Sequence, residues 1–315
     1  MRTKRINISS PELDNTEQKW WDDNAQVIEK IWAQNIHFQN VIRLPYLSKM
    51  KAFFLAGNSK RPVKILEIGC GSGWVCRLVA DKDFHVIGTD FSQGQLAIAH
   101  QNAKAFDKEA YCTYEQADAS TFQKKDIDGV VIHALLHHLS TEELTNFFEQ
   151  FAQLPSGTKI FMYEPVFFNR QAGEKSLRDK IINKLIYKLR NYSLARARKI
   201  GSTDPELAKV MTRIDKDAAE NGWYISPKEV PFYEGELERF VEPLCTLQKK
   251  YIVNKTELDI AQELTLNSID KPDGFFANTL IPLAIKLDEL SFSGKFTHYM
   301  EEHQHLFVCF EWVKK

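Results

Sequence analysis

The sequence predicts an α/β protein built on a doubly wound, mostly parallel sheet. Two observations lead to this prediction. Between residues 61 and 165, short apolar runs rich in β-branched side chains alternate with segments whose apolar residues recur at helical spacing. A glycine-rich turn joins the first apolar run to the first helical segment. Strands that alternate with helices of this length form right-handed βαβ units, so the strands run parallel and helices cover both faces of the sheet.

Seven strands are expected along the chain. The first, 63–68, ends at glycines, and apolar residues follow it at helical spacing from Trp74 onward. Ser140 and Glu143 form a capping box, which predicts that a helix begins there. The motif Ser226-Pro227-Lys228-Glu229 predicts a second helix start. The other strands are expected at 84–89, 110–115, 127–132, 158–163, 246–253 and 306–313.

Outside residues 61–165 the sequence no longer alternates between short strands and helices. Trp21, Ile28 and Trp32 fall on one face of an N-terminal helical segment. A long basic helical stretch follows the fifth strand, and we expect it to be a lid because connections in such sheets are usually short. This lid and the segment around Trp20 and Trp21 are both expected to close over the site. The four expected units are a helical cap (1–60), the core (61–165), the helical insertion or lid (166–225) and the C-terminal part of the core with its own helical insertion (226–315).

Composition excludes several classes of protein. The chain has 315 residues with 41 Lys+Arg and 42 Asp+Glu, so no whole-molecule charge attracts nucleic acid or membrane. We expect no integral membrane segment, because no apolar run is long enough to span a bilayer. An odd number of cysteines without metal-ligand spacing indicates a metal-free protein of the reducing cytoplasm. The five cysteines are Cys70, Cys76, Cys112, Cys245 and Cys309.

The turn after the first strand reads Glu67-Ile68-Gly69-Cys70-Gly71-Ser72-Gly73. Glycines at alternate positions allow a tight turn and let a ligand approach backbone amides at a helix N-terminus. A dinucleotide fingerprint would need glycine at position 74, where this chain has Trp74. Taken alone, the turn is as compatible with a plain structural role as with ligand binding.

Two acids follow neighbouring strands at the same edge of the predicted sheet. Asp90 follows the second strand, where a carboxylate can accept hydrogen bonds from both hydroxyls of a ribose. Asp118 follows the third strand, where it can accept from an adenine amine. Each acid alone can be a solvated loop residue. Together with the glycine turn they indicate a ligand site, because open α/β sheets bind ligands beyond the carboxyl ends of their strands.

With these motifs the chain resembles the class I S-adenosylmethionine-dependent methyltransferases, and most of all the small-molecule branch related to the quinone-biosynthesis enzymes. The resemblance covers residues 62–165. It depends on the glycine turn, Asp90, Asp118-Ala119 and Ala134-Leu135-Leu136-His137-His138-Leu139. It implies a Rossmann-like sheet of seven strands whose last strand is antiparallel, with His303-Gln304-His305-Leu306-Phe307-Val308-Cys309-Phe310 in the closing hairpin.

The resemblance also implies roles for individual residues. The glycine turn would hold the methionine part of the cofactor, Asp90 the ribose and Asp118 the adenine, with Phe91 packed on the adenine ring. Phe91 can equally be an ordinary core residue. The full set expected to bind S-adenosylmethionine is Glu67, Gly69, Cys70, Gly71, Gly73, Asp90, Phe91, Asp118 and Ala119.

Methyl transfer needs alignment of the reacting atoms, and it needs a base only where the acceptor must lose a proton. His133, His137 and His138 lie just beyond the fourth strand, near the expected methyl group, and His137 is our preferred base. Glu164 at the end of the fifth strand is a second polar candidate. The alternative is that the histidines merely cap the strand. The expected reaction is methylation of a small-molecule hydroxyl or amine.

Two other functions are compatible with the same sequence features. A nucleotide-dependent oxidoreductase and a non-catalytic S-adenosylmethionine-binding protein are the alternatives. No nucleic-acid partner is expected, because strand four is not followed by the Asn/Asp-Pro-Pro-aromatic sequence of amino-directed nucleic-acid enzymes. Residues 170–199 form a basic amphipathic segment that can contact an anionic acceptor or a membrane surface, although a solvated face is the simpler interpretation. Its apolar stripe is Leu177, Ile181, Leu185 and Leu189.

Overall fold

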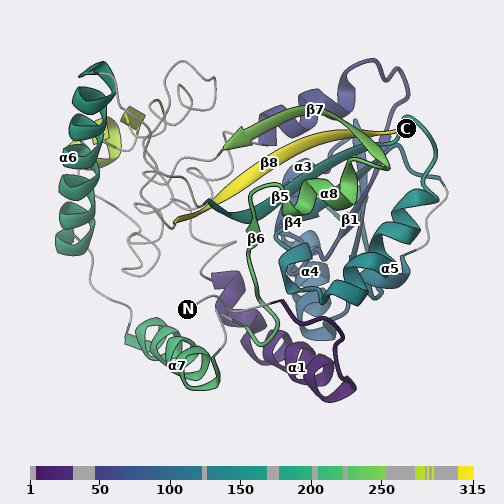
Figure 1. Ribbon diagram of the computed structural model, residues 1–315, viewed down its shortest axis with the longest axis horizontal. Coiled ribbons are helices and arrows are strands. Elements are labelled where there is room, and N and C mark those ends of the chain that lie inside the picture. Colours follow the sequence, from purple (N-terminus) through teal and green to yellow (C-terminus); the bar gives the residue numbers. More distant parts are fainter. Residues whose placement is uncertain are drawn as a thin grey trace.

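The computed structural model contains one mixed sheet with helices on both faces (Figure 1). The residues that it describes are 5–30, 47–122, 126–168, 177–200, 205–222, 226–252, 274–280, 282–283, 286 and 304–315. Trp32 and the residues 170–176 of the expected lid lie outside this set. The helices are α1 (Pro11–Ile28), α3 (Trp74–Val79), α4 (Gln93–Ala105), α5 (Thr141–Ala152), α6 (Leu177–Ile200), α7 (Pro205–Asn221) and α8 (Glu236–Val241), with a further helix over 47–55.

The main path of the sheet has seven strands in the order β3-β2-β1-β4-β5-β8-β7. Strands β1 to β5 are parallel, and β8 is antiparallel to both β5 and β7. The predicted doubly wound sheet with an antiparallel last strand is therefore confirmed. The bounds are β1 (Val63–Ile68), β2 (Phe84–Asp90), β3 (Cys112–Gln116), β4 (Gly129–His133), β5 (Lys159–Phe168), β7 (Cys245–Ile252) and β8 (Gln304–Lys314).

An eighth strand, β6 (Phe232–Tyr233), pairs in parallel with the last residues of β5, at Val166 and Phe167. The sequence does not predict it. Strand β5 runs to Phe168, beyond the predicted end at residue 163, and β4 pairs only with its first half. The second half of β5 is thus free to pair with β6.

The prediction that a helix begins at Ser226 is wrong. Residues 226–228 form a turn instead. The backbone N–H of Lys228 donates to Glu17 Oε2 at 3.0 Å, and the N–H of Val230 donates to the carbonyl of His137 at 2.8 Å. In a helix the N–H of Val230 would donate to the carbonyl of Ser226, so its bond to His137 replaces a helical one. The two bonds hold the segment against α1 and against the residues that follow β4.

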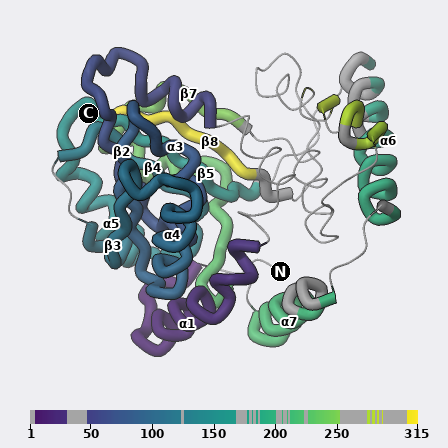
Figure 2. Tube along the Cα trace, turned by 180° about the vertical axis from the view of Figure 1, so that it is seen from behind, coloured from purple at the N-terminus to yellow at the C-terminus, as the bar shows by residue number. Residues whose placement is uncertain are grey.

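Two apolar clusters lie on opposite faces of the sheet. On one face, α3, α4 and the helix over 47–55 pack on the strands through residues such as Val75, Ala99 and Phe54. On the other face, α5 and α8 pack through residues such as Phe147 and Leu237. Figure 2 shows α3 and α4 in front of the sheet with α1 beside α4. The predicted capping box is present, since Ser140 Oγ accepts from the N–H of Glu143 and Glu143 Oε2 accepts from the N–H of Ser140.

Helices α6 and α7 lie to one side of the sheet (Figures 1 and 2). Part of α6 packs against the short helix η4 (Phe276–Leu280). Arg213 of α7 donates to Asn24 Oδ1 of α1 at 2.7 Å, so α7 is connected to the N-terminal helix. Among the described helices, none has the length and apolar character needed to cross a bilayer.

Candidate functional site

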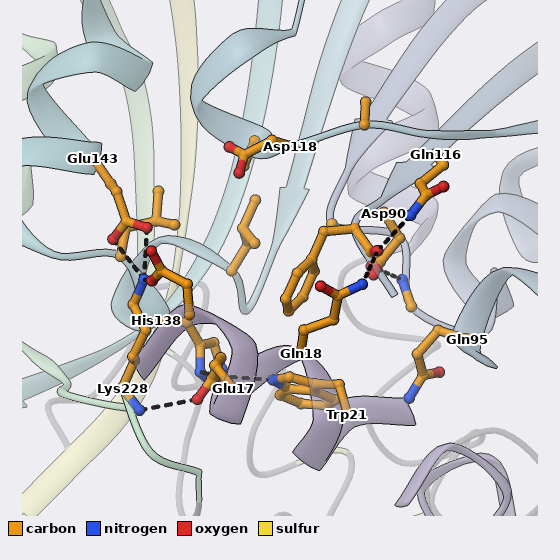
Figure 3. Close-up of a pocket in the computed structure, with 18 of the residues that line it drawn as sticks. Glu17, Gln18, Trp21, Asp90, Gln95, Gln116, Asp118, His138, Glu143 and Lys228 are labelled. Carbon is orange, nitrogen blue, oxygen red and sulfur yellow. Dashed lines mark hydrogen bonds and ion pairs between the residues drawn. The ribbon is translucent and has the colours of Figure 1, made fainter. Parts of the chain in front are cut away.

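A cavity of about 460 Å³ lies at the carboxyl ends of the central strands, where ligands of such sheets bind (Figure 3). Helix α1 covers it from one side. Of the two segments expected to close over the site, α1 borders the cavity, and none of the described residues of α6 or α7 lines it. The described lining residues are Asp14, Asn15, Glu17, Gln18, Trp21, Gly69, Gly71, Asp90, Phe91, Gln95, Gln116, Ala117, Asp118, Ala119, Ala134, Leu135, His138, Leu139, Glu143 and Lys228.

The glycine turn forms one wall of the cavity. Gly69, Gly71 and Gly73 all have positive φ angles, between +53° and +71°, which side chains rarely adopt. A Cβ on Gly69 would lie 2.6 Å from Leu135, and one on Gly73 would lie 2.6 Å from Tyr114. Gly69 and Gly71 line the cavity, whereas Gly73 leaves room for the ring of Tyr114 on β3. The turn therefore combines ligand access with a tight core.

Asp90 is bound to the same turn. Its Oδ2 accepts from the N–H of Gly71 at 2.8 Å, and its Oδ1 accepts from the N–H of Ser92 at 2.9 Å. Burial raises the pKa of Asp90 to about 6, although these two hydrogen bonds favour the carboxylate. Each oxygen keeps a lone pair for a ligand in the cavity.

Asp118, Phe91 and Ala119 line the part of the cavity beyond β2 and β3. Asp118 Oδ1 accepts from the N–H and the hydroxyl of Ser120, at 2.7 and 2.6 Å, and so begins the short helix η2 (Ala119–Thr121). The carbonyl of Phe91 accepts from the side chain of Gln18, at 3.2 Å. The loop after β2 is thus held by α1.

Glu67 and Cys70, two further residues expected to bind cofactor, lie behind the turn and do not line the cavity. Glu67 accepts from the thiol of Cys76 at 2.8 Å, and burial raises its pKa to about 8. Burial likewise raises the pKa of Cys70 to about 11. Both side chains support the turn from the core side.

Three of the four catalytic candidates do not line the cavity either. His133 stacks on Tyr163 with ring centroids 4.5 Å apart, and burial lowers its pKa to about 4. His137 Nδ1 lies 2.7 Å from Glu164 Oε2. Glu164 is fully buried, which raises its pKa to about 7, and its Oε1 also accepts from the N–H groups of Leu135 and Leu136. The structure brings His137 and Glu164 together, but neither lines the cavity.

His138 is the histidine that lines the cavity. Its Nδ1 lies 3.1 Å from Glu17 Oε1 and 3.1 Å from the hydroxyl of Ser226. Burial disfavours the imidazolium, but the hydrogen bond and charge of Glu17 outweigh it and raise the pKa of His138. Trp21 packs edge-on against the imidazole at 5.3 Å and donates its indole N–H to Glu17 at 2.8 Å. Helix α1 thus fixes the orientation of this histidine.

The end of the cavity beyond His138 carries a buried ammonium group. Lys228 Nζ lies 2.8 Å from Asp14 Oδ1 and 2.6 Å from Glu143 Oε1. Figure 3 shows Lys228 and Glu143 beside His138, on the opposite side of the cavity from Asp90 and Gln95. The cavity therefore has two distinct ends.

One group of side chains offers potential metal ligands. His137, His138 and Glu229 each place one ligand atom within 4.8 Å of the others. The Nδ1 atoms of both imidazoles are oriented by carboxylates, Glu164 and Glu17, as is common around metals and around catalytic histidines alike.

The sequence gives no prediction that Glu17, Gln18, Gln95 or Lys228 borders the cavity, and it marks Lys228 only as part of an expected helix start. Trp21 belongs to the segment that was expected to close over the site, and it does line the cavity. Gln95 lies on the first turn of α4, five residues after Asp90. This short separation in sequence indicates that it borders the same ligand as the acid. No comparable signal marks Glu17, because its partners other than Trp21 come from segments more than 100 residues away.

Part of the chain is similar to known proteins. Residues 65–155 match a family model described as a methyltransferase domain. A ubiquinone biosynthesis O-methyltransferase of Dinoroseobacter shibae is 25% identical over 148 residues, which are 44% of this chain and 57% of the relative. The corresponding enzyme of Actinobacillus pleuropneumoniae is 33% identical over 101 residues, which are 31% of this chain and 38% of the relative. The chain thus matches about half the length of these relatives.

Solved structures share the fold. A phosphoethanolamine N-methyltransferase 2 of Haemonchus contortus superposes with a TM-score of 0.55 at 17% identity, covering 98% of this chain and 61% of the other. The cyclase SpnF superposes with a TM-score of 0.55 at 14% identity, covering 99% of both chains. Because a cyclase and a methyltransferase share this architecture, the fold alone does not fix the reaction.

Proposed function

Residues 65–155 of this chain are a methyltransferase domain on the class I fold, and from this premise we propose that the protein transfers a methyl group from S-adenosylmethionine to a hydroxyl or amine of a small molecule. One observation carries the proposal. A single cavity joins the glycine turn, Asp90 and Asp118 at one end to His138 at the other. A cofactor and an acceptor held in such a cavity would have their reacting atoms side by side.

The residues present fit the cofactor. Asp90 and Asp118 offer carboxylate oxygens for ribose hydroxyls and an adenine amine, and the backbone at Gly69 and Gly71 is open to the cavity. When bound, S-adenosylmethionine supplies an electrophilic methyl group on a positively charged sulfur. The volume of about 460 Å³ falls in the range usual for small-ligand sites.

His138 is the group that we assign to proton removal. Its Nδ1 faces Glu17, which leaves Nε2 to take the proton of the acceptor. The lone pair of the acceptor atom then forms the new bond to carbon, while the bond from that carbon to sulfur breaks and its electrons stay on sulfur. His137 lies one residue away but holds Glu164, so we assign it a supporting role.

The binding half of this proposal is tested with Asp90→Ala. We expect the variant to bind S-adenosylhomocysteine more weakly than the wild type by about 1–3 kcal/mol, because a pair of ribose hydroxyls loses its acceptor. Isothermal titration calorimetry measures the difference. Equal affinity in the two proteins, or a preference of the wild type for a dinucleotide, would contradict the proposal.

We also propose that α6 contacts an anionic membrane surface. Leu177, Ile181 and Leu185 recur every four residues and are between 54% and 75% exposed. Lys184 and Lys188 are exposed on the same stretch of helix. Apolar side chains flanked by lysines suit the boundary between acyl chains and negatively charged headgroups.

A further inference from the structure

Gln95 lines the cavity with an amide that has no hydrogen-bond partner. It lies on the first turn of α4 and is 1% exposed. Among the described residues, neither its Oε1 nor its Nε2 has a partner within hydrogen-bonding distance. Buried amides in folded proteins are nearly always satisfied, and an unsatisfied one destabilises the protein. An amide kept in this state beside a ligand cavity indicates that a ligand completes its hydrogen bonds.

The neighbours of Gln95 show which part of a ligand it faces. Its backbone N–H donates to Ser92 Oγ at 3.1 Å, and the N–H of Ser92 donates to Asp90 at 2.9 Å. Asp90 in turn accepts from the N–H of Gly71, and Gln95 Oε1 lies 3.7 Å from the position that a Cβ on Gly71 would take. The amide and the Asp90 carboxylate therefore flank the same point of the glycine turn. Figure 3 shows both on the side of the cavity away from Lys228 and Glu143.

The chemistry of the two side chains is complementary. A carboxylate only accepts hydrogen bonds, whereas an amide both donates and accepts. A vicinal diol offers two hydroxyl donors and two oxygen acceptors. Asp90 alone satisfies the donors, and the oxygens then need an N–H such as that of Gln95 Nε2. Adenine is a poorer candidate, because Asp118 and Ala119 line a separate part of the cavity.

We propose that Gln95 binds the ribose diol of the cofactor together with Asp90. The inference rests on the proposed function, because it takes the cofactor to be an adenosine derivative. It adds a second side chain, from α4, to the one acid that the sequence indicates for the ribose. In the complex the amide forms hydrogen bonds that add to the affinity for the ligand. In the ligand-free protein it is unsatisfied and lowers the stability of the fold.

The substitution Gln95→Leu tests this inference, because leucine has a similar volume and no polar atoms. We expect the ligand-free variant to unfold at a temperature about 2 °C or more above the wild type, since an unsatisfied amide is removed. We expect its affinity for S-adenosylhomocysteine to fall about tenfold. Gln101→Leu, an exposed position on the same helix, is the control and should change neither quantity.

A second ligand separates the ribose from the amino-acid end. 5′-Methylthioadenosine carries the same ribose and adenine but lacks the amino acid, so the loss in Gln95→Leu should persist with it. A loss confined to S-adenosylhomocysteine would assign the amide to the amino-acid end and overturn the inference. So would a lowered unfolding temperature with unchanged affinity, which is the behaviour of a packing residue. If the wild type binds neither compound, both the proposed function and this inference fail. If the wild type binds them and Gln95→Leu binds them equally well, only this inference is overturned.

Discussion

At the scale of single residues, the pair formed by Glu17 and His138 controls the proposed chemistry. Glu17, Glu229 and Glu164 all raise the pKa of His138 against the effect of burial. Glu17 has its own pKa lowered, because His138 outweighs the effect of burial on the carboxylate. A histidine held in this way stays protonated to a higher pH than a free one.

This pair predicts a pH dependence of activity. His138 must be neutral to accept a proton, so kcat/KM should rise with pH through a value above the usual 6.5 or so of histidine. Glu17→Gln removes the charge that raises the pKa, and it should shift this inflection to lower pH. A pH–rate profile of both proteins measures the shift. Identical profiles would show that Glu17 does not act through His138.

Substitution of the histidine itself should lower kcat by roughly 10²–10⁴-fold, the usual contribution of a general base, with cofactor affinity nearly unchanged. His138→Gln gives this result if the assignment is right. His137→Gln is the matched comparison, and we expect it to reduce stability rather than kcat because it removes the imidazole that pairs with Oε2 of the buried Glu164. The reverse pattern would indicate that His137 is the base.

Addition of a chelator to the wild type shows separately whether His137, His138 and Glu229 hold a metal that activity needs.

The sequence identified the two adjacent histidines but not which of them faces the cavity. That choice depends on the short helix η3 (Leu136–His138), which turns successive side chains in different directions. It also depends on Glu17, whose distance along the chain hides it from any local pattern. By contrast, Asp90 and Asp118 could be predicted, because the ends of parallel strands meet at one edge of the sheet whatever the loops do.

At the scale of elements, α1 is part of the site rather than an appendage to it. Asp22 Oδ1 accepts from the hydroxyl of Ser92 at 2.5 Å and from the N–H of Gly94 at 2.8 Å, at the beginning of α4. Glu29 lies 3.3 Å from Arg77, whose other nitrogen donates to the carbonyl of Ser72 in the glycine turn. The helix is therefore attached to both structures that border the ribose end of the cavity.

Loosening this attachment should weaken cofactor binding. Asp22→Ala leaves the Ser92 hydroxyl and the Gly94 N–H without their acceptor, and we expect it to cost about 1–2 kcal/mol in affinity for S-adenosylhomocysteine. Asp23→Ala is the control on the same helix, because Asp23 only forms an exposed pair with Lys19. Calorimetry on the two variants measures the effect. Equal affinities in both would mean that α1 is docked independently of Asp22.

Some helices and strands could be predicted from the sequence and others could not. The helix at Ser140 was predictable because its capping box is complete within four residues. The segment at Ser226 carries a similar local signal, yet Glu17 and the carbonyl of His137 accept its backbone N–H groups and a turn results. Strand β6 was unpredictable for the same reason, since it exists only where β5 extends beyond β4.

At the scale of the whole molecule, α6 gives the protein one amphipathic face away from the cavity. We expect the protein to sediment with vesicles of phosphatidylglycerol and phosphatidylcholine but not with phosphatidylcholine alone. The double variant Ile181→Asp and Leu185→Asp should lose this binding, whereas Ile8→Asp, at an exposed apolar position outside α6, should keep it. Equal sedimentation with both kinds of vesicle, or none with either, would mean that α6 has an ordinary solvated surface.

The burial of the Cys70 thiol has a consequence for the proposed methyl transfer. A sulfonium methyl donor is an alkylating agent, and Cys70 sits in the very turn proposed to hold it. Only the thiolate is a strong nucleophile, and with a pKa of about 11 roughly one thiol in 10⁴ is ionised at pH 7. The side chain also packs toward Gly88 in the core instead of toward the cavity. In the proposed reaction this arrangement would protect the protein against methylating its own thiol, and turnover would not end in self-inactivation.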